Sequence, residues 1–160
     1  MLGSTEDGAR IAAALGVGFA FAHHINPDSA EYATQVYRRM FKASPRLDRP
    51  RVILALSAIC ADSSEAAEEL ASSLELGWMC LRSGKPSPTE AMNYQYNDSE
   101  RQLAQATRAH FTAGTPEEVK SRLLGLADLC QADEIMIMTM AHSHTARIRS
   151  YELLAQTFQL

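Results

Sequence analysis

Residues 52–61 read VILALSAICA, an apolar run that only Ser57 interrupts. Such a continuous run is typical of a strand that is covered on both faces, as in a parallel sheet. Asp62 follows the run directly, and Asp62 with Glu65 has the spacing of a capping box. The pattern therefore predicts a buried strand and then a long helix, which we expect to continue to Arg82.

The same strand–helix order recurs on both sides of this unit. The expected helices carry an apolar stripe and a capping residue, a proline or a glycine at one end. In chain order the other elements are a helix at 7–15 closed by Gly16, a strand at 18–23, a helix from Asn26-Pro27 to Phe41, a helix from 100 to about 110, a helix at 116–130 capped by Thr115 and Glu118, a strand at 135–141 and a helix at 147–158. This alternation predicts an α/β fold with a parallel sheet. Three such strands form an arc, because a closed (β/α)8 barrel needs eight strands and about 250 residues.

Residues 83–99 differ from the rest of the chain. They contain Gly84, Pro86 and Pro88, two tyrosines and two asparagines, and they show no helical period. We expect a long loop here, and long loops in compact domains are usually functional or mobile.

Length and charge narrow the class of protein. The 160 residues suit one domain over 1–160, and the net charge of -4 comes without a basic stripe, which argues against a nucleic-acid partner. The one basic cluster, at 38–42, is interpreted as a solvated helix face. No stretch is long enough to span a membrane. The three cysteines, widely spaced and set in apolar runs, predict buried, reduced thiols in a cytoplasmic protein; they are Cys60, Cys80 and Cys130.

Polar residues follow each expected strand. In parallel α/β folds the sites lie at the carboxyl ends of the strands. These residues are His23, His24 and Asn26 after the first strand, Cys60 and Asp62 after the second, and His142, Ser143 and His144 after the third. With the opening turn Gly3-Ser4-Thr5 at the same level, four of the five histidines are expected on one rim.

The opening turn has two interpretations. Backbone N–H groups at the following helix start, with the Ser4 hydroxyl, could hold a phosphate. Alternatively, Ser4 or Thr5 is a plain helix N-cap. From the residues alone the cap is favoured, because Glu6 and Asp7 already neutralise that helix end.

The histidines also raise the question of a metal. Adjacent residues on a strand point to opposite faces, so His23 and His24 cannot easily share one ion, and no cysteine or carboxylate is spaced to complete a set. We predict no metal site. No dinucleotide fingerprint or nucleophile elbow is present either. The seven methionines, four of them at 79, 136, 138 and 140, are interpreted as core filler.

Four stretches together carry a resemblance that covers nearly the whole chain. They are LGST at 2–5 followed by ARIAAALGVGFAFAHHINP at 9–27, VILALSAICADSSEAAEELA at 52–71, TAGTPEEVKSRLLGLADLCQADEIMIMT at 112–139, and HTARIRSYELLA at 144–155. In this order they resemble the C-terminal half of the bacterial luciferase-like flavin-dependent monooxygenases, in the alkanal-monooxygenase-like subgroup.

The resemblance implies a (β/α)8 barrel, typically dimeric, that binds reduced FMN at its C-terminal rim and uses O2 to oxidise a small organic substrate such as an aldehyde. By position, Gly3 and Ser4 fall in the turn that contacts the flavin phosphate. The resemblance thus moves Gly3–Thr5 from a cap to a phosphate turn. Gly8 falls where relatives often offer a second hydroxyl, a contact expected to be lost here. His23 and His24 fall beside the flavin ring.

His144 and Arg147 match the closing segment of the family and are expected to be structural. Barrel strands one to four, and most of strand five, lie outside the match, so no catalytic residue is assigned. Two hypotheses follow. The chain is a monooxygenase subunit that pairs with a copy of itself or with a separate N-terminal half. Alternatively, it is a non-catalytic, flavin-binding or structural remnant. In both we expect association through uncovered strand edges and little turnover by the chain alone.

Overall fold

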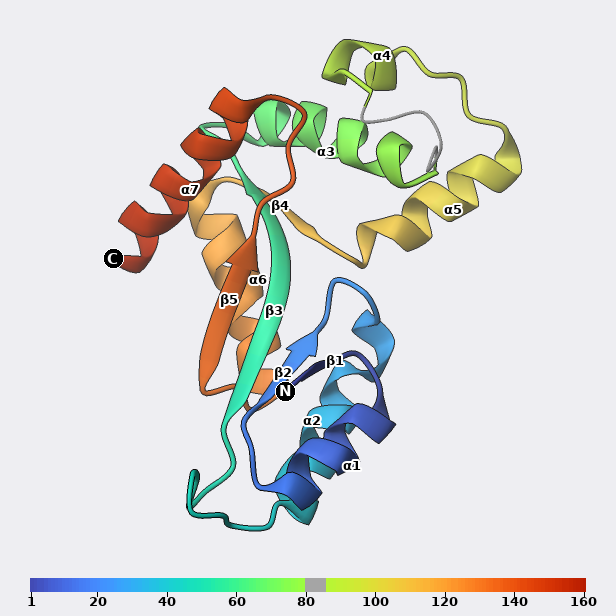
Figure 1. Ribbon diagram of the computed structural model, residues 1–160. Helices are drawn as coiled ribbons and strands as arrows, with labels where there is room; N and C mark the ends of the chain where they lie inside the picture. Colours follow the sequence, from blue (N-terminus) through green and yellow to red (C-terminus); the bar gives the residue numbers. More distant parts are fainter. Residues whose placement is uncertain (80–85) are drawn as a thin grey trace. The chain divides into compact units, whose positions relative to one another are not determined.

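The computed structural model describes residues 1–79 and 86–160, which form two compact units (Figure 1). The first unit comprises Met1–Leu56 and Leu123–Met138, and the second comprises Ser57–Arg122 and Thr139–Leu160. Cys80, the predicted helix end at Arg82, and residues 83–85 of the predicted loop lie outside the described residues. That residues 1–160 form a single domain remains a prediction.

The sheet of the first unit is built from adjacent strands, as the alternation predicts. β1 (Leu2–Gly3) pairs in parallel with β2 (Phe19–Ala22), and β2 pairs in parallel with β3 (Val52–Cys60). β5 (Glu134–Met138) pairs with β3. β1 and β5 are therefore the outer strands here, and the two-residue strand β1 leads into the opening turn.

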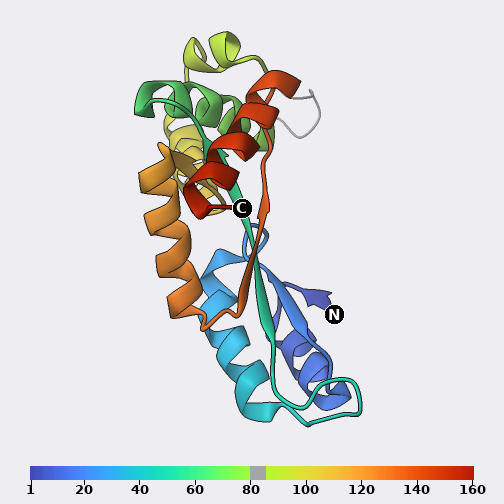
Figure 2. The same cartoon turned by 90° about the vertical axis from the view of Figure 1, so that its left-hand side faces the viewer.

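Two helices that lie side by side pack on these strands (Figures 1 and 2). They are α1 (Glu6–Leu15) and α2 (Ala30–Met40), and a short 3-10 helix, η1 (Pro27–Ser29), precedes α2. α1 ends at Gly16 with φ 63°, the left-handed cap that the sequence predicts. Tyr37 is fully buried, and its ring centroid lies 5.5 Å from that of Phe19.

Asp133 joins three segments of the first unit. Its Oδ2 accepts hydrogen bonds from the Val52 N–H at 2.7 Å and from the Arg38 guanidinium at 2.6 Å. Arg38 also donates through Nε to the Gln131 carbonyl at 3.1 Å. The interpretation of cluster 38–42 as a solvated face is therefore wrong for Arg38, because a partner far along the chain holds its guanidinium.

The second unit contains the end of β3 and most of the helices. β4 (Thr112–Gly114) pairs in parallel with residues 58–60 of β3. The helices are α3 (Ser64–Met79), α4 (Pro88–Met92), α5 (Asp98–Arg108), α6 (Pro116–Leu129), which begins here and ends in the first unit, and α7 (His144–Phe158). Ile59 packs with Ala71, Leu74 and Phe111 in a buried cluster.

Capping in the second unit differs in part from the expectation. Thr115 and Glu118 form the predicted reciprocal bonds, with the Thr115 N–H donating to Glu118 Oε2 at 2.8 Å. Asp62 does not cap α3. The Ala66 N–H donates instead to Ser63 Oγ at 3.2 Å, and the Asp62 carboxylate accepts from Arg149 Nε at 3.1 Å.

The predicted loop at 83–99 contains regular structure. Ser87 with Glu90 caps α4, and Asn97 with Glu100 caps α5, each as a full capping box. The interpretation of the whole stretch as a loop is therefore wrong for 88–92. Local capping signals outweigh the prolines, because Pro88 stands at the first helical position, where its missing N–H costs nothing.

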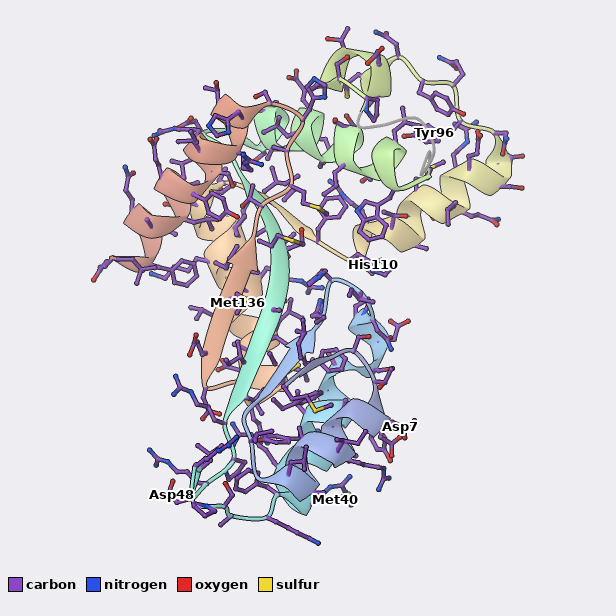
Figure 3. All side chains as sticks on the ribbon, viewed as in Figure 1. Asp7, Met40, Asp48, Tyr96, His110 and Met136 are labelled. Carbon is purple, nitrogen blue, oxygen red and sulfur yellow. The ribbon has the colours of Figure 1, made fainter. Side chains whose placement is uncertain are left out.

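β5 is shorter and more exposed than the covered strand predicted for 135–141. Met136 lies on β5 with 51% of its surface exposed (Figure 3), so its interpretation as core filler is wrong, whereas Met140 packs against the cluster around Ile59. Glu134 and Met136 are exposed while Ile135 and Ile137 are half-buried, so the face of β5 that carries Met136 is open to solvent. Within residues 1–79 and 86–160, no helix combines the length and apolarity needed to cross a bilayer.

Candidate functional site

The opening turn connects β1 to α1, and Thr5 is the N-cap of α1. Thr5 has extended backbone angles, and its Oγ1 accepts a hydrogen bond from the Gly8 N–H at 3.2 Å. Its carbonyl accepts the first helical bond, from the Ala9 N–H, at 3.2 Å. Of the two cap candidates, Thr5 rather than Ser4 therefore has this role.

The cap leaves other donors of the same turn for a ligand. The N–H groups of Glu6 and Asp7 have no acceptor within the helix, because they belong to its first turn. They lie with the Ser4 hydroxyl at the positive end of the helix dipole. Capping by Thr5 and anion binding by its neighbours are thus compatible, and the two interpretations from sequence are not exclusive.

The acidic residues of this turn oppose an anion less than the sequence suggests. Glu6 Oε1 accepts from Arg10 Nε at 2.8 Å, so Arg10 offsets its charge, and the same bond raises the pKa of Arg10. Asp7 is exposed (Figure 3). The turn therefore offers neutral donors beside one carboxylate.

Gly3 and Gly8 bring the end of β1 close to the first turn of α1. A Cβ on Gly3 would lie 3.3 Å from the Phe19 ring and 3.7 Å from the Gly8 Cα. A Cβ on Gly8 would meet Thr5 Oγ1 at 3.6 Å and the Gly3 Cα at 3.8 Å, which are ordinary contacts. A side chain is therefore tight at Gly3, whereas a serine at Gly8 has room for its Cβ.

Asn26 does not cap the helix that follows it, contrary to the expectation. Its side chain makes no capping bond to η1. Its Nδ2 donates instead to the Ser4 carbonyl at 2.9 Å, across 22 residues of sequence. The end of β2 is thus tied to the opening turn by a contact that the Asn-Pro pair, which usually signals a cap, does not reveal.

The two expected flavin-side histidines lie in the turn after β2. His23 is buried, and its N–H donates to the Ala55 carbonyl at 3.0 Å. His24 Nδ1 lies 3.2 Å from the same carbonyl. Because β1 and β2 are parallel neighbours, the structure brings all six candidate residues to one edge of the first unit's sheet; they are Gly3, Ser4, Thr5, Gly8, His23 and His24.

The other expected rim residues belong to the second unit. The pKa of Asp62 is lowered by the hydrogen bond from Arg149. His144 opens α7 and lies 2.8 Å from Arg147 Nη2 through its Nδ1, in keeping with a structural role. Burial raises the pKa of Cys60 to about 11, so its thiol is protonated. A rim that joins all four histidines remains a prediction, and the described residues contain no group of three side chains placed to hold a metal.

Comparison with known proteins assigns the chain to a family. Residues 1–133 match the family model for the luciferase-like monooxygenases. Protein YceB of Bacillus subtilis (strain 168) is 38% identical over 164 residues, which cover 99% of this chain and 49% of YceB. The crystal structure of apo-MsnO8 superposes with a TM-score of 0.89 at 29% identity, covering 99% of this chain and 50% of that one.

A more distant solved structure shows the fold alone. It is the oxygenating constituent of 3,6-diketocamphane monooxygenase from Pseudomonas putida in complex with FMN, with a TM-score of 0.60, 15% identity, and coverage of 98% of this chain and 46% of that one. The chain spans about half the length of these relatives. It has the α/β architecture of part of their barrel and belongs to the luciferase-like monooxygenase family.

Proposed function

We propose that this chain supplies the flavin-phosphate side of an FMN-dependent monooxygenase that oxidises a small, aldehyde-like organic substrate with O2. The observation that carries the proposal is the family match over residues 1–133, which begins with the opening turn. The FMN complex of the diketocamphane enzyme, which shares the fold, supports the choice of cofactor. Reduced FMN, when bound, would supply the electrons for the reduction of O2.

The donor set of the opening turn fits the phosphate of FMN. The N–H groups of Glu6 and Asp7 and the Ser4 hydroxyl would hold it. Gly3 lies so close to Phe19 that a side chain at this position would be tight, and as a glycine it places no side chain beside these donors. His23 and His24 would lie beside the flavin ring. The phosphate donors named here, two N–H groups and one hydroxyl, are neutral, so a cation from elsewhere would complete the phosphate site.

Binding of FMN by the chain tests this proposal. Titration with FMN, followed by flavin fluorescence, is expected to saturate. Ser4→Asp is expected to weaken binding about tenfold or more, because it places a carboxylate against the phosphate. Ser99→Asp makes the same change in the first turn of α5 and is expected to leave the affinity unchanged. The absence of saturable binding to the wild-type chain would refute the phosphate turn.

We also propose that activity requires the remaining barrel strands, from a copy of this chain or from an N-terminal half. The outer strands of the first unit support this, because Leu2 of β1 is 68% exposed and Met136 of β5 is 51% exposed. Open edges of this kind favour pairing with further strands. We expect light scattering to show an oligomer, and a monodisperse monomer would contradict association through these edges.

The neutral donor set at the opening turn also favours a second candidate function, a flavin-binding half-barrel without turnover. Co-expression with the N-terminal half of YceB separates the two. With NADH, a flavin reductase and a medium-chain aldehyde, the first proposal predicts oxidation by the co-expressed pair and little by the chain alone. The second predicts FMN binding and no oxidation in either sample.

A further inference from the structure

The side chain of Asn26 contacts the opening turn instead of its own helix. An asparagine before a proline is well suited to cap the next helical turn, and such a cap is worth about 1 kcal/mol. In this protein the capping bond to η1 is not made. The amide instead donates to the Ser4 carbonyl at 2.9 Å.

This single bond restricts the orientation of the Ser4–Thr5 peptide. A trans peptide is planar, with its C=O and N–H pointing in opposite directions. Holding the Ser4 carbonyl toward Asn26 therefore directs the Thr5 N–H away from Asn26. The next peptide is held by the Thr5 carbonyl, which accepts from Ala9, and the Thr5 side chain is held by Gly8. Of these three hydrogen bonds to the turn, only the one from Asn26 is donated by a residue outside α1.

We propose that Asn26 is a positioning residue for phosphate recognition: it orders the Ser4–Thr5 peptide so that the donors of the opening turn converge before the ligand binds. The inference rests on the phosphate turn proposed above. A donor set that is ordered in advance loses less conformational entropy on binding, which raises its affinity for the group it is shaped to hold.

The experiment compares FMN with riboflavin, which has the same ring system and no phosphate. Both affinities are measured by fluorescence titration for the wild-type chain, Asn26→Ala and Asn26→Asp; neither variant can donate to the Ser4 carbonyl at neutral pH. We expect the preference for FMN over riboflavin to fall about five- to tenfold in both variants, the range expected for one lost hydrogen bond. The riboflavin affinity is expected to stay unchanged.

Tyr37→Phe is the matched control. It removes a hydroxyl that donates to the Val17 carbonyl at 3.0 Å and accepts from the Arg51 N–H at 3.1 Å, in the same unit. It is expected to lower stability and to leave the FMN preference as in the wild type. If riboflavin binding does not reach saturation, the FMN affinities of the two Asn26 variants are compared with that of Tyr37→Phe, and a loss in the Asn26 variants alone supports the positioning role.

Each other outcome has one meaning. If the wild type prefers FMN and both Asn26 variants keep that preference, the positioning role is wrong and the phosphate turn stands. If both ligands weaken equally, Asn26 is merely structural and the inference is also wrong. If the wild type shows no preference for FMN, the phosphate turn itself fails, and the role of Asn26 fails with it.

Discussion

The same substitution, glycine to alanine, is expected to have opposite effects at two positions of the first unit. Gly16 ends α1 with φ 63°, a backbone conformation that costs an alanine about 1–2 kcal/mol. Gly125 lies within α6, and an added Cβ there would meet nothing within 4 Å. An exposed helix interior prefers alanine to glycine by about 0.5–1 kcal/mol.

Gly16 carries a second penalty, from packing. An added Cβ would lie 2.5 Å from the Lys42 carbonyl and 2.6 Å from the Ser44 Cβ. These neighbours are held in place, because the Lys42 N–H donates to the Ala13 carbonyl at 3.0 Å and Ser44 Oγ donates to the Gly16 carbonyl at 2.8 Å. Overpacking against such a site costs about 1–3 kcal/mol, so with the backbone strain the total for Gly16→Ala is about 2–5 kcal/mol.

Urea unfolding followed by circular dichroism at 222 nm measures both effects. This signal reports the helices of both units, whereas the only tryptophan, Trp78, lies in the second unit. Gly16→Ala is expected to lower the unfolding midpoint strongly, and Gly125→Ala to raise it slightly. A cost below about 1 kcal/mol for Gly16→Ala would refute the argument from backbone strain and packing.

Two further substitutions and one labelling experiment test other parts of the structure. Asp133→Ala removes the acceptor of the Val52 N–H and the partner of Arg38, and the free energy of unfolding in urea is expected to fall by about 1–2 kcal/mol, since solvent screens part of the pair. Burial raises the pKa of Cys60 to about 11, above the ordinary thiol value of 9.0. The stability that the buried, protonated thiol contributes is therefore fully present below pH 9 and is lost as the pH rises through 11. Iodoacetamide at pH 8 is therefore expected to leave Cys60 unmodified in the folded chain and to label it in urea, as read by peptide mass mapping. Asp7→Asn removes a carboxylate beside the proposed phosphate position and is expected to raise the FMN affinity about two- to threefold at low salt, an effect that should shrink as salt is added.

Elements with local signals were predictable from the sequence. Gly16 ends α1, and Thr115 with Glu118 opens α6, because these signals act within one turn of the helix they delimit. The run at 52–61 became β3 for a similar reason, since an almost uninterrupted apolar segment fits only a covered position. None of these three predictions requires knowledge of a distant partner.

The predictions that failed depend on partners far away in the sequence. Asp62 has the residue type and the spacing to Glu65 that are typical of a helix cap, yet its carboxylate accepts a hydrogen bond from Arg149, 87 residues later. Arg38 is held by Asp133, 95 residues later. Met136 is exposed because one face of β5 is left uncovered, a property that its own apolar sequence cannot indicate. At the site, Asn26 was expected on the rim and at a helix start, but its partner was missed, because its amide donates to a carbonyl 22 residues earlier.

At the opening turn, the sequence suggested a choice between a helix cap and a phosphate turn, although the two are compatible. A helix start has several donors, and one cap residue satisfies one of them. Thr5 takes the Gly8 N–H, while Arg10 offsets Glu6 one helical turn away, so the sequence features that favoured a plain cap leave the anion-binding groups in place. Charge is the remaining constraint. A phosphate dianion beside Asp7 gains from neutral donors but is not neutralised by them, and Arg10 is already paired. We therefore propose the phosphate turn for this chain on the basis of its neutral donors, with the compensating cation coming from another segment, which is the contribution we propose for the remaining strands of the barrel.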